Sequence, residues 1–293
     1  MARARGRFRL RRKDDLRRAA LRVLGLRLAL MSKFEKALPG PEAVHDLRVE
    51  TRRLRAGLEF FKKALDPERS GRSETELRRI GAALGKVRDL DVLLAGLDKD
   101  LRGFSRAERR ALAPFRDRGA AAALRARRAL KELLESPRYR RFKKELSSRL
   151  AGDAGRGRRA SRPAAKAGRA LIAGRLEALL EAGEAARAGG YGPGALHRLR
   201  ISSKKLRYAC EFFTDLCGRP AAELAGKAAR LQDLLGACRD SALMLERVRR
   251  ARGGGGARLR LLLACRRRAR RRREAAVRAW ERFRRGAALP DPR

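Results

Sequence analysis

Apolar residues recur at helical spacing along most of the 293-residue chain. Strand-type alternation is almost absent, and the β-branched and aromatic residues that favour strands are sparse. Ala, Leu, Arg and Glu dominate instead, and all four are good helix formers. The pattern therefore predicts an all-α fold.

Proline, glycine and helix-capping residues divide the pattern into two halves, about 14–150 and 164–285, joined by a linker-like segment at about 151–163. In the first half, helices are expected over about 14–37, 41–65, 74–98, 105–135 and 137–150. In the second half, they are expected over about 164–188, 193–217, 221–250 and 257–285. We expect each half to form a bundle of about four helices, flanked by a flexible basic arm (1–13) and a tail (286–293).

One stretch of the chain occurs twice. Residues 40–61 read GPEAVHDLRVETRRLRAGLEFF, residues 192–213 read GPGALHRLRISSKKLRYACEFF, and about half of the aligned positions are identical. The only two histidines, His45 and His197, fall on equivalent positions. A second pair of segments, LGKVRD and LGACRD, follows each copy at nearly the same offset. The chain therefore reads as an internal duplication, and we expect its halves to pack about a pseudo-twofold axis.

Each repeated helix sorts its cations onto one face. At about 100° per residue, the first copy aligns a basic row opposite a core-facing stripe, and the second copy repeats the arrangement. The first row is His45, Arg48, Arg52 and Arg55, continued by Glu59; its core stripe is Leu47, Leu54, Leu58 and Phe61. The second row is His197, Arg200, Lys204 and Arg207, continued by Glu211; its core stripe is Leu199, Leu206, Cys210 and Phe213. Cations that recur once per turn suit a linear anion, and Arg adds bidentate phosphate geometry.

The residues in and around the rows have either an anion-binding or a structural interpretation. The histidines either contact an anion or orient the row. Glu59 and Glu211 are expected to hold neighbouring Arg side chains in place, and Asp89 and Asp240 to brace the basic rows. Arg88 and Arg239 either bind anion or pair with acids. Arg79 and Arg230 match across the halves and are weaker candidates.

The charge balance indicates a polyanionic partner. Lys and Arg number 77 against 33 Asp and Glu, giving a formal net charge of +44. Such a charge opposes compaction through self-repulsion, so we expect a polyanion to use it. The four cysteines lack metal-ligand spacing and fit a reducing cytoplasm. No apolar run reaches membrane-span length, and the Arg-rich N-terminus resembles either a disordered arm or a transit peptide.

The two motif helices, each with its E-F-F ending, and the two L-G-x-x-R-D segments resemble the CHAD family, the conserved-histidine α-helical domains. The resemblance spans about residues 14–285 and implies two four-helix bundles with a basic channel or groove that binds inorganic polyphosphate. It implies binding positions at His45, Arg48, Arg52, Arg53, Arg55, His197, Arg200, Lys204, Lys205 and Arg207. Arg53 and Lys205 lie off the basic rows, so their inclusion rests on the resemblance alone. The same surface would serve polyphosphate-granule targeting, chain-length sensing or enzyme recruitment.

Some relatives carry a triphosphatase domain with an E-x-E-x-K motif, but the nearest string here, ETELR at 74–78, lies in a helical pattern. The acids are scattered rather than clustered for a metal, and no nucleotide-binding glycine loop is present. We therefore expect a stand-alone binding domain with no catalytic residues, metal or cofactor. The runner-up is general nucleic-acid binding, for which stacking aromatics are poorly supplied. A phosphate-ester hydrolase is the third alternative.

Overall fold

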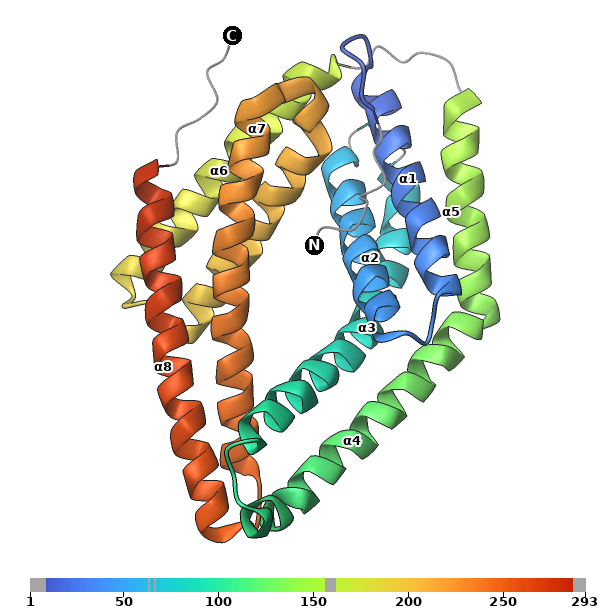
Figure 1. Ribbon diagram of the computed structural model, residues 1–293. Helices are drawn as coiled ribbons and strands as arrows, with labels where there is room; N and C mark the ends of the chain where they lie inside the picture. The colour runs from blue at the N-terminus through green and yellow to red at the C-terminus, as the bar shows by residue number, and fades with distance from the viewer. Residues whose placement is uncertain (1–8, 63, 66, 156–161, 287–293) are drawn as a thin grey trace.

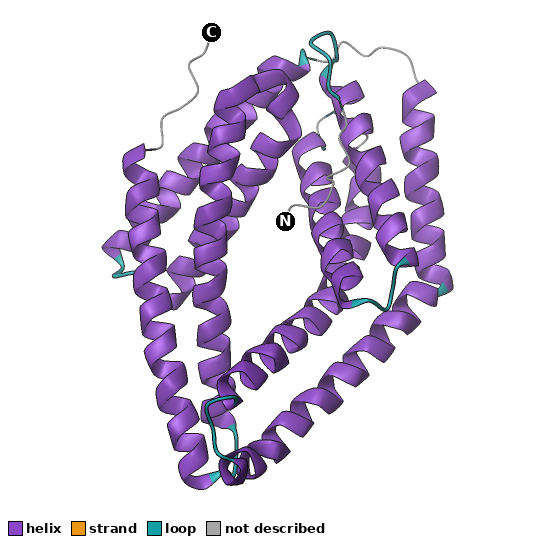
Figure 2. Cartoon of the chain, viewed as in Figure 1, coloured by secondary structure: helices purple, strands orange, loops and turns teal. Residues whose placement is uncertain are grey.

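The computed structural model describes residues 9–62, 64–65, 67–155 and 162–286, and within these ranges its regular elements are all helices (Figure 2). The helices are α1 (Leu16–Lys36), α2 (Pro41–Phe61), α3 (Pro67–Leu101), α4 (Arg106–Glu135), α5 (Pro137–Gly155), α6 (Ala164–Ala188), α7 (Pro193–Arg250) and α8 (Gly255–Gly286). The all-α prediction is confirmed.

Local sequence chemistry sets most helix ends. The predicted capping box of α4 is present: the Ser105 hydroxyl accepts from the Glu108 backbone N–H, and the Glu108 carboxylate accepts from the Ser105 N–H. Both motif helices, α2 and α7, begin with proline at the first turn. Gly218 breaks α7 with a φ of 66°, which favours glycine, so α7 is two helical segments joined by a kink. This kink lies where the sequence predicts the second motif helix to end.

The helices form two groups, which contact each other at the far ends of their longest helices and again between α2 and α7. In Figure 1, α1, α2 and α5 with the start of α3 lie on one side, and α6, the two segments of α7, and α8 lie on the other. The α3–α4 hairpin crosses to the lower ends of α7 and α8. There an apolar cluster that includes Leu97, Phe104 and Val248 joins the two hairpins. The cluster fixes how the groups are spaced around the centre of the molecule.

Two expectations about boundaries need correction. The first half of the chain has the five helices that the five predicted ranges give, α1 to α5, so the expectation of a bundle of about four helices does not hold for it. The predicted linker also begins too early, since α5 continues to Gly155; residues 156–161 lie outside the described part.

The two E-F-F segments pack against each other where the groups meet. The ring centroids of Phe61 and Phe213 are 5.7 Å apart, and those of Phe60 and Phe212 are 5.9 Å apart. Phe61, Phe212 and Phe213 are almost fully buried. This aromatic contact, with about 0.5–1.5 kcal/mol per pair beyond the area buried, sets α2 beside the first segment of α7.

The described part of the basic arm packs onto the second group. Leu10 is buried, and its N–H donates to Asp215 at 3.0 Å. Residues 9–13 therefore do not behave as the free arm that the sequence suggested. Residues 1–8 and 287–293, the rest of the predicted arm and nearly all of the tail, lie outside the described part.

Candidate functional site

The basic rows lie on α2 and on the first segment of α7, opposite buried apolar stripes. Leu47, Leu54, Leu199 and Leu206 are fully buried, as the helical period predicts. The cations of both rows remain partly exposed. Burial of one stripe therefore holds each row at the surface of its helix.

The two rows converge across the boundary between the groups. Desolvation lowers the pKa of Arg48, and repulsion from Arg52 and from Arg200 of the other row lowers it further. Desolvation likewise lowers the pKa of Arg200, and Arg239 and Arg52 add to the shift. The pKa of Lys204 falls to about 8 through desolvation and then repulsion from Arg52 and Arg200. Such mutual repulsion requires the cations of the two helices to lie close together.

Most of these converging cations have no acidic partner. In the described part of the chain, no carboxylate lies within ion-pair distance of Arg52, Arg55, Arg200 or Lys204. The Nε of Arg52 is buried without a hydrogen-bond partner. Unpaired, partly desolvated cations are costly in a folded protein. The arrangement is therefore suited to an anion supplied from outside.

The L-G-x-x-R-D segments form the surface next to the rows. A Cβ on Gly85 would lie 3.9 Å from the Arg48 guanidinium, and a Cβ on Gly236 would lie 3.9 Å from Arg200 Nε. Arg48 Nη2 is 3.6 Å from Asp89, so Asp89 braces the first row. Desolvation by its surroundings raises the pKa of Asp240, although the nearby Arg200 opposes the shift. Each glycine thus lies beside one row arginine, at a distance that a Cβ would also tolerate.

Both histidines are held in the neutral form by their surroundings. Desolvation lowers the pKa of His45, and Arg88 and other cations add to it. Desolvation also lowers the pKa of His197, followed by Arg239, whose Nη1 lies 3.1 Å from His197 Nε2. A neutral imidazole accepts from a guanidinium. The neutral ring of His197 therefore contacts Arg239, and a bound anion would favour protonation of either histidine.

Arg53 does not belong to the accessible surface, and its place in the predicted binding set needs correction. Its side chain is 5% exposed and pairs with Glu50 at 2.7 Å and with Glu211 at 2.9 Å. Burial lowers its pKa, but the two carboxylates outweigh burial and raise it. The residue is a buried ion-pair centre between the groups, because packing of α2 against α7 points it inward.

Three further predicted residues are also engaged in ion pairs. Lys205 Nζ contacts Glu59 at 2.8 Å, and Arg207 Nε contacts Glu211 at 2.8 Å. Glu59 and Glu211 thus each form an ion pair with a neighbouring cation. Arg79 pairs with Glu76 at 3.1 Å on α3.

Other predicted residues lie apart from the rows or were missed. Arg230 is exposed, and its Nη1 lies 3.7 Å from the position that a Cβ on Gly226 of the same helix would take. Among the described residues, no ion pair joins Arg230 to a row residue. A cavity of about 240 Å³ adjoins the site and is lined by Asp89, Asp240, Arg247, Arg268 and Arg272. Its arginines were not predicted; the Arg-rich run in α8 was the available signal for Arg268 and Arg272, whereas Arg247 belongs to α7.

Within the described ranges, no three His, Cys, Asp or Glu residues gather in a way that could hold a metal ion. All four cysteines are free thiols. No described helix has both the length and the apolarity needed to cross a bilayer. The chemistry that the site offers is electrostatic and hydrogen-bonding contact with phosphate-like oxygens.

The fold and site define a class: an all-helical protein with converging basic helices between two helix groups. The CHAD domain family model matches residues 22–249, and the chain belongs to this family. It is similar to the crystal structure of the CHAD domain from the plant Ricinus communis, with 25% identity, a TM-score of 0.71, and 98% of this chain and 97% of that chain covered. It also shares the fold of PptA from Streptomyces chartreusis, with 19% identity, a TM-score of 0.65, and 92% and 100% covered. No curated protein matches the chain.

Proposed function

We propose that this chain binds inorganic polyphosphate along the two converging basic rows, without catalysing a reaction. The observation that carries the proposal is the group of Arg52, Arg55, Arg200 and Lys204, which come from two helices and lack ion-pair partners in the described chain. Membership of the CHAD family supports the same ligand. The four free thiols fit a reducing compartment such as the cytoplasm.

A linear polymer of phosphates matches this geometry. Successive row positions rise by about 5.4 Å per helical turn, so a flexible chain can contact several cations of one row. The opposing row supplies a second set of donors to the same chain. Desolvation, and after it repulsion among the cations, lowers the pKa of Arg48, Arg200 and Lys204, and a bound polyanion would offset the repulsion.

Nucleic acid is the competing ligand class. It would use the same phosphate contacts through counterion release. The rows, however, offer few aromatic platforms: Phe61, Phe212 and Phe213 are buried in the core between the groups. Bases therefore have no stacking surface among these residues.

A competition titration tests the proposal. Labelled long-chain polyphosphate is bound to the full-length protein and displaced by unlabelled polyphosphate, duplex DNA or single-stranded RNA at several salt concentrations. We expect polyphosphate to compete best at about 0.15 M salt and to bind more tightly as its chain lengthens. Equal competition by DNA or RNA at that salt concentration would contradict the proposal. Release of orthophosphate by the purified protein with Mg²⁺ would contradict the non-catalytic part.

A further inference from the structure

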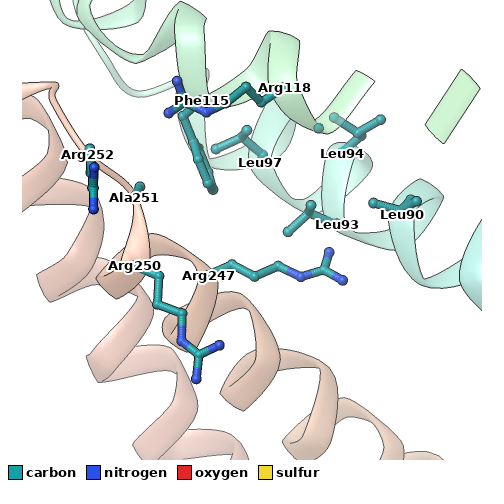
Figure 3. Close-up of a pocket in the computed structure, with 11 residues that line it drawn as sticks. Leu90, Leu93, Leu94, Leu97, Phe115, Arg118, Arg247, Arg250, Ala251 and Arg252 are labelled. Carbon is teal, nitrogen blue, oxygen red and sulfur yellow. The ribbon is translucent and has the colours of Figure 1, made fainter. Parts of the chain in front are cut away.

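A second cavity, separate from the basic rows, lies where the α3–α4 hairpin meets the end of α7. Its volume is about 520 Å³, within the range of small-molecule sites. Figure 3 shows leucines of α3 and Phe115 of α4 on one side and arginines from the end of α7 on the other. The cavity therefore has an apolar wall and a cationic rim.

The apolar wall is made by Leu93, Leu94 and Leu97 with Phe115. Leu97 is nearly fully buried in the cluster that joins the hairpins, while Leu93 and Leu94 are half-buried and have surface left to cover. At about 25 cal/mol per Å², covering such surface favours an apolar ligand group. A polyphosphate chain would gain nothing from this wall and would place charge against it.

The rim of the cavity is cationic. Arg118, Arg247 and Arg252 line the cavity, and in the described part of the chain none of the three is ion-paired. Arg250, which also lines it, is engaged with Glu246 at 2.7 Å. A neutral apolar ligand would make no use of these guanidinium groups, of which those of Arg118 and Arg252 are exposed and that of Arg247 is partly buried. An anionic head group would accept their hydrogen bonds.

We propose that this cavity binds a single-chain amphiphile with an anionic head, such as a long-chain carboxylate or alkyl phosphate. The alkyl chain lies against Leu93, Leu94 and Phe115, and the head is held by Arg247 with Arg118 and Arg252. The leucines line the space where α3, α4 and α7 meet, so a single alkyl chain can lie along them. The proposal does not rest on polyphosphate binding.

Isothermal titration of the full-length protein tests it with dodecyl phosphate and dodecanoate below their micelle concentrations. We expect saturable binding of one molecule per chain. Dodecyl maltoside and dodecyltrimethylammonium, which share the tail but lack the anionic head, should bind at least about tenfold more weakly, because they forgo the charge-assisted hydrogen bonds.

Matched variants locate the site. Arg247→Gln should raise the Kd about tenfold or more, and Ala251→Trp, which fills the mouth of the cavity, should abolish binding. Arg249→Gln removes an exposed arginine two residues away that does not line the cavity, and should change the Kd less than about twofold. Thermal unfolding checks that each variant is folded, and Arg252→Gln, an exposed rim position, replaces Ala251→Trp if that variant is not.

Four results would overturn the proposal. They are non-saturable uptake, equal binding of dodecyl maltoside, equal losses in Arg247→Gln and Arg249→Gln, and binding to anionic lipid vesicles without binding to the monomeric amphiphiles. The first two exclude a head-specific site, the third indicates diffuse charge, and the fourth indicates a membrane surface.

Discussion

The Arg53 guanidinium lies 2.9 Å from the Glu211 carboxylate and links α2 to α7. The equivalent residues in the opposite copies, Lys205 and Glu59, form the reciprocal pair at 2.8 Å. The repeated sequence thus makes the same inter-helix ion pair twice. The copies differ in burial: Arg53 is 5% exposed, whereas Lys205 is 35% exposed. Equivalent positions are therefore expected to differ in their contribution to stability.

The first prediction compares Arg53→Met with Lys205→Met in urea unfolding. Arg53→Met removes the cation between the buried carboxylate of Glu50 and the nearly buried one of Glu211, which keep Arg27 and Arg207 as partners. It should lower the free energy of unfolding by about 2–3 kcal/mol. Lys205→Met removes a solvent-exposed pair and should cost less than about 1 kcal/mol. Similar losses in both variants would show that burial does not separate the two pairs.

The sequence predicts which cations form the two rows, but it does not predict that Arg53 is buried. Helical period alone places Arg48, Arg52, Arg200 and Lys204 opposite buried leucines, and the structure agrees. Arg53 follows Arg52 in the chain, and on a projection of the single helix it falls near the boundary between the core-facing and exposed faces. Its burial depends on how α2 packs against α7, which a single-helix pattern does not contain. The resemblance therefore assigned Arg53 to the ligand, while periodicity had placed it off the row.

The rim arginines of the apolar cavity were beyond prediction for a related reason. Arg118 belongs to α4, and Arg247 and Arg252 to the end of α7 and the segment after it. The two regions meet only because the α3–α4 hairpin crosses to α7. In an Arg-rich chain, single arginines at such distances carry no sequence signal.

The second prediction concerns the pH dependence of stability. The pKa of Lys204 in the folded protein is about 8, below its ordinary value of 10.5. Between these values the unfolded chain binds more protons than the folded one, so stability of the unliganded protein should rise as pH increases from 8 to 10.5. Below pH 8, Lys204 is charged in both the folded and the unfolded chain, and the cost of burying this charge in the folded protein is fully present. Lys204→Met should be more stable near neutral pH and should lack this part of the rise; an unchanged pH profile would place Lys204 outside the repelling group.

The third prediction links protonation to the ligand. A polyanion favours charged Lys204, so polyphosphate binding near pH 9 should be accompanied by proton uptake. Titration calorimetry in two buffers of different ionisation enthalpy measures the number of protons. The uptake should be smaller in Lys204→Arg, which keeps the charge and does not titrate in this range. Equal uptake in both proteins would assign the proton to another group.

The fourth prediction concerns the histidines. Their pKa values are lowered below 6.5, so both rings are neutral near pH 7.5. As the pH falls through this lowered range, each ring gains a charge that a bound polyanion stabilises, and polyphosphate affinity should increase. The double variant His45→Ala/His197→Ala should bind almost normally at pH 7.5 and lose most of the increase at lower pH. A large loss at pH 7.5 would instead assign the neutral rings a direct role, such as the contact between His197 and Arg239.

The last prediction tests whether the two rows hold one ligand. If they do, Arg52→Gln and Arg200→Gln, taken from different helices, should each weaken long-chain polyphosphate binding about tenfold, because each removes charge-assisted hydrogen bonds. Each should also reduce the slope of log affinity against log salt by about one. Arg128→Gln removes an exposed arginine on α4, distant in sequence from both rows, and serves as the matched charge control.

The double variant separates shared from independent binding. Two rows on one chain should give losses that depart from additivity, since Arg52 and Arg200 already interact in the unliganded protein. Strictly additive losses, with twice the stoichiometry expected for a shared site, would mean that each row binds its own chain. A loss in Arg128→Gln as large as in the row variants would mean that net charge alone attracts the polymer, and the convergence of α2 and α7 would then have no part in recognition.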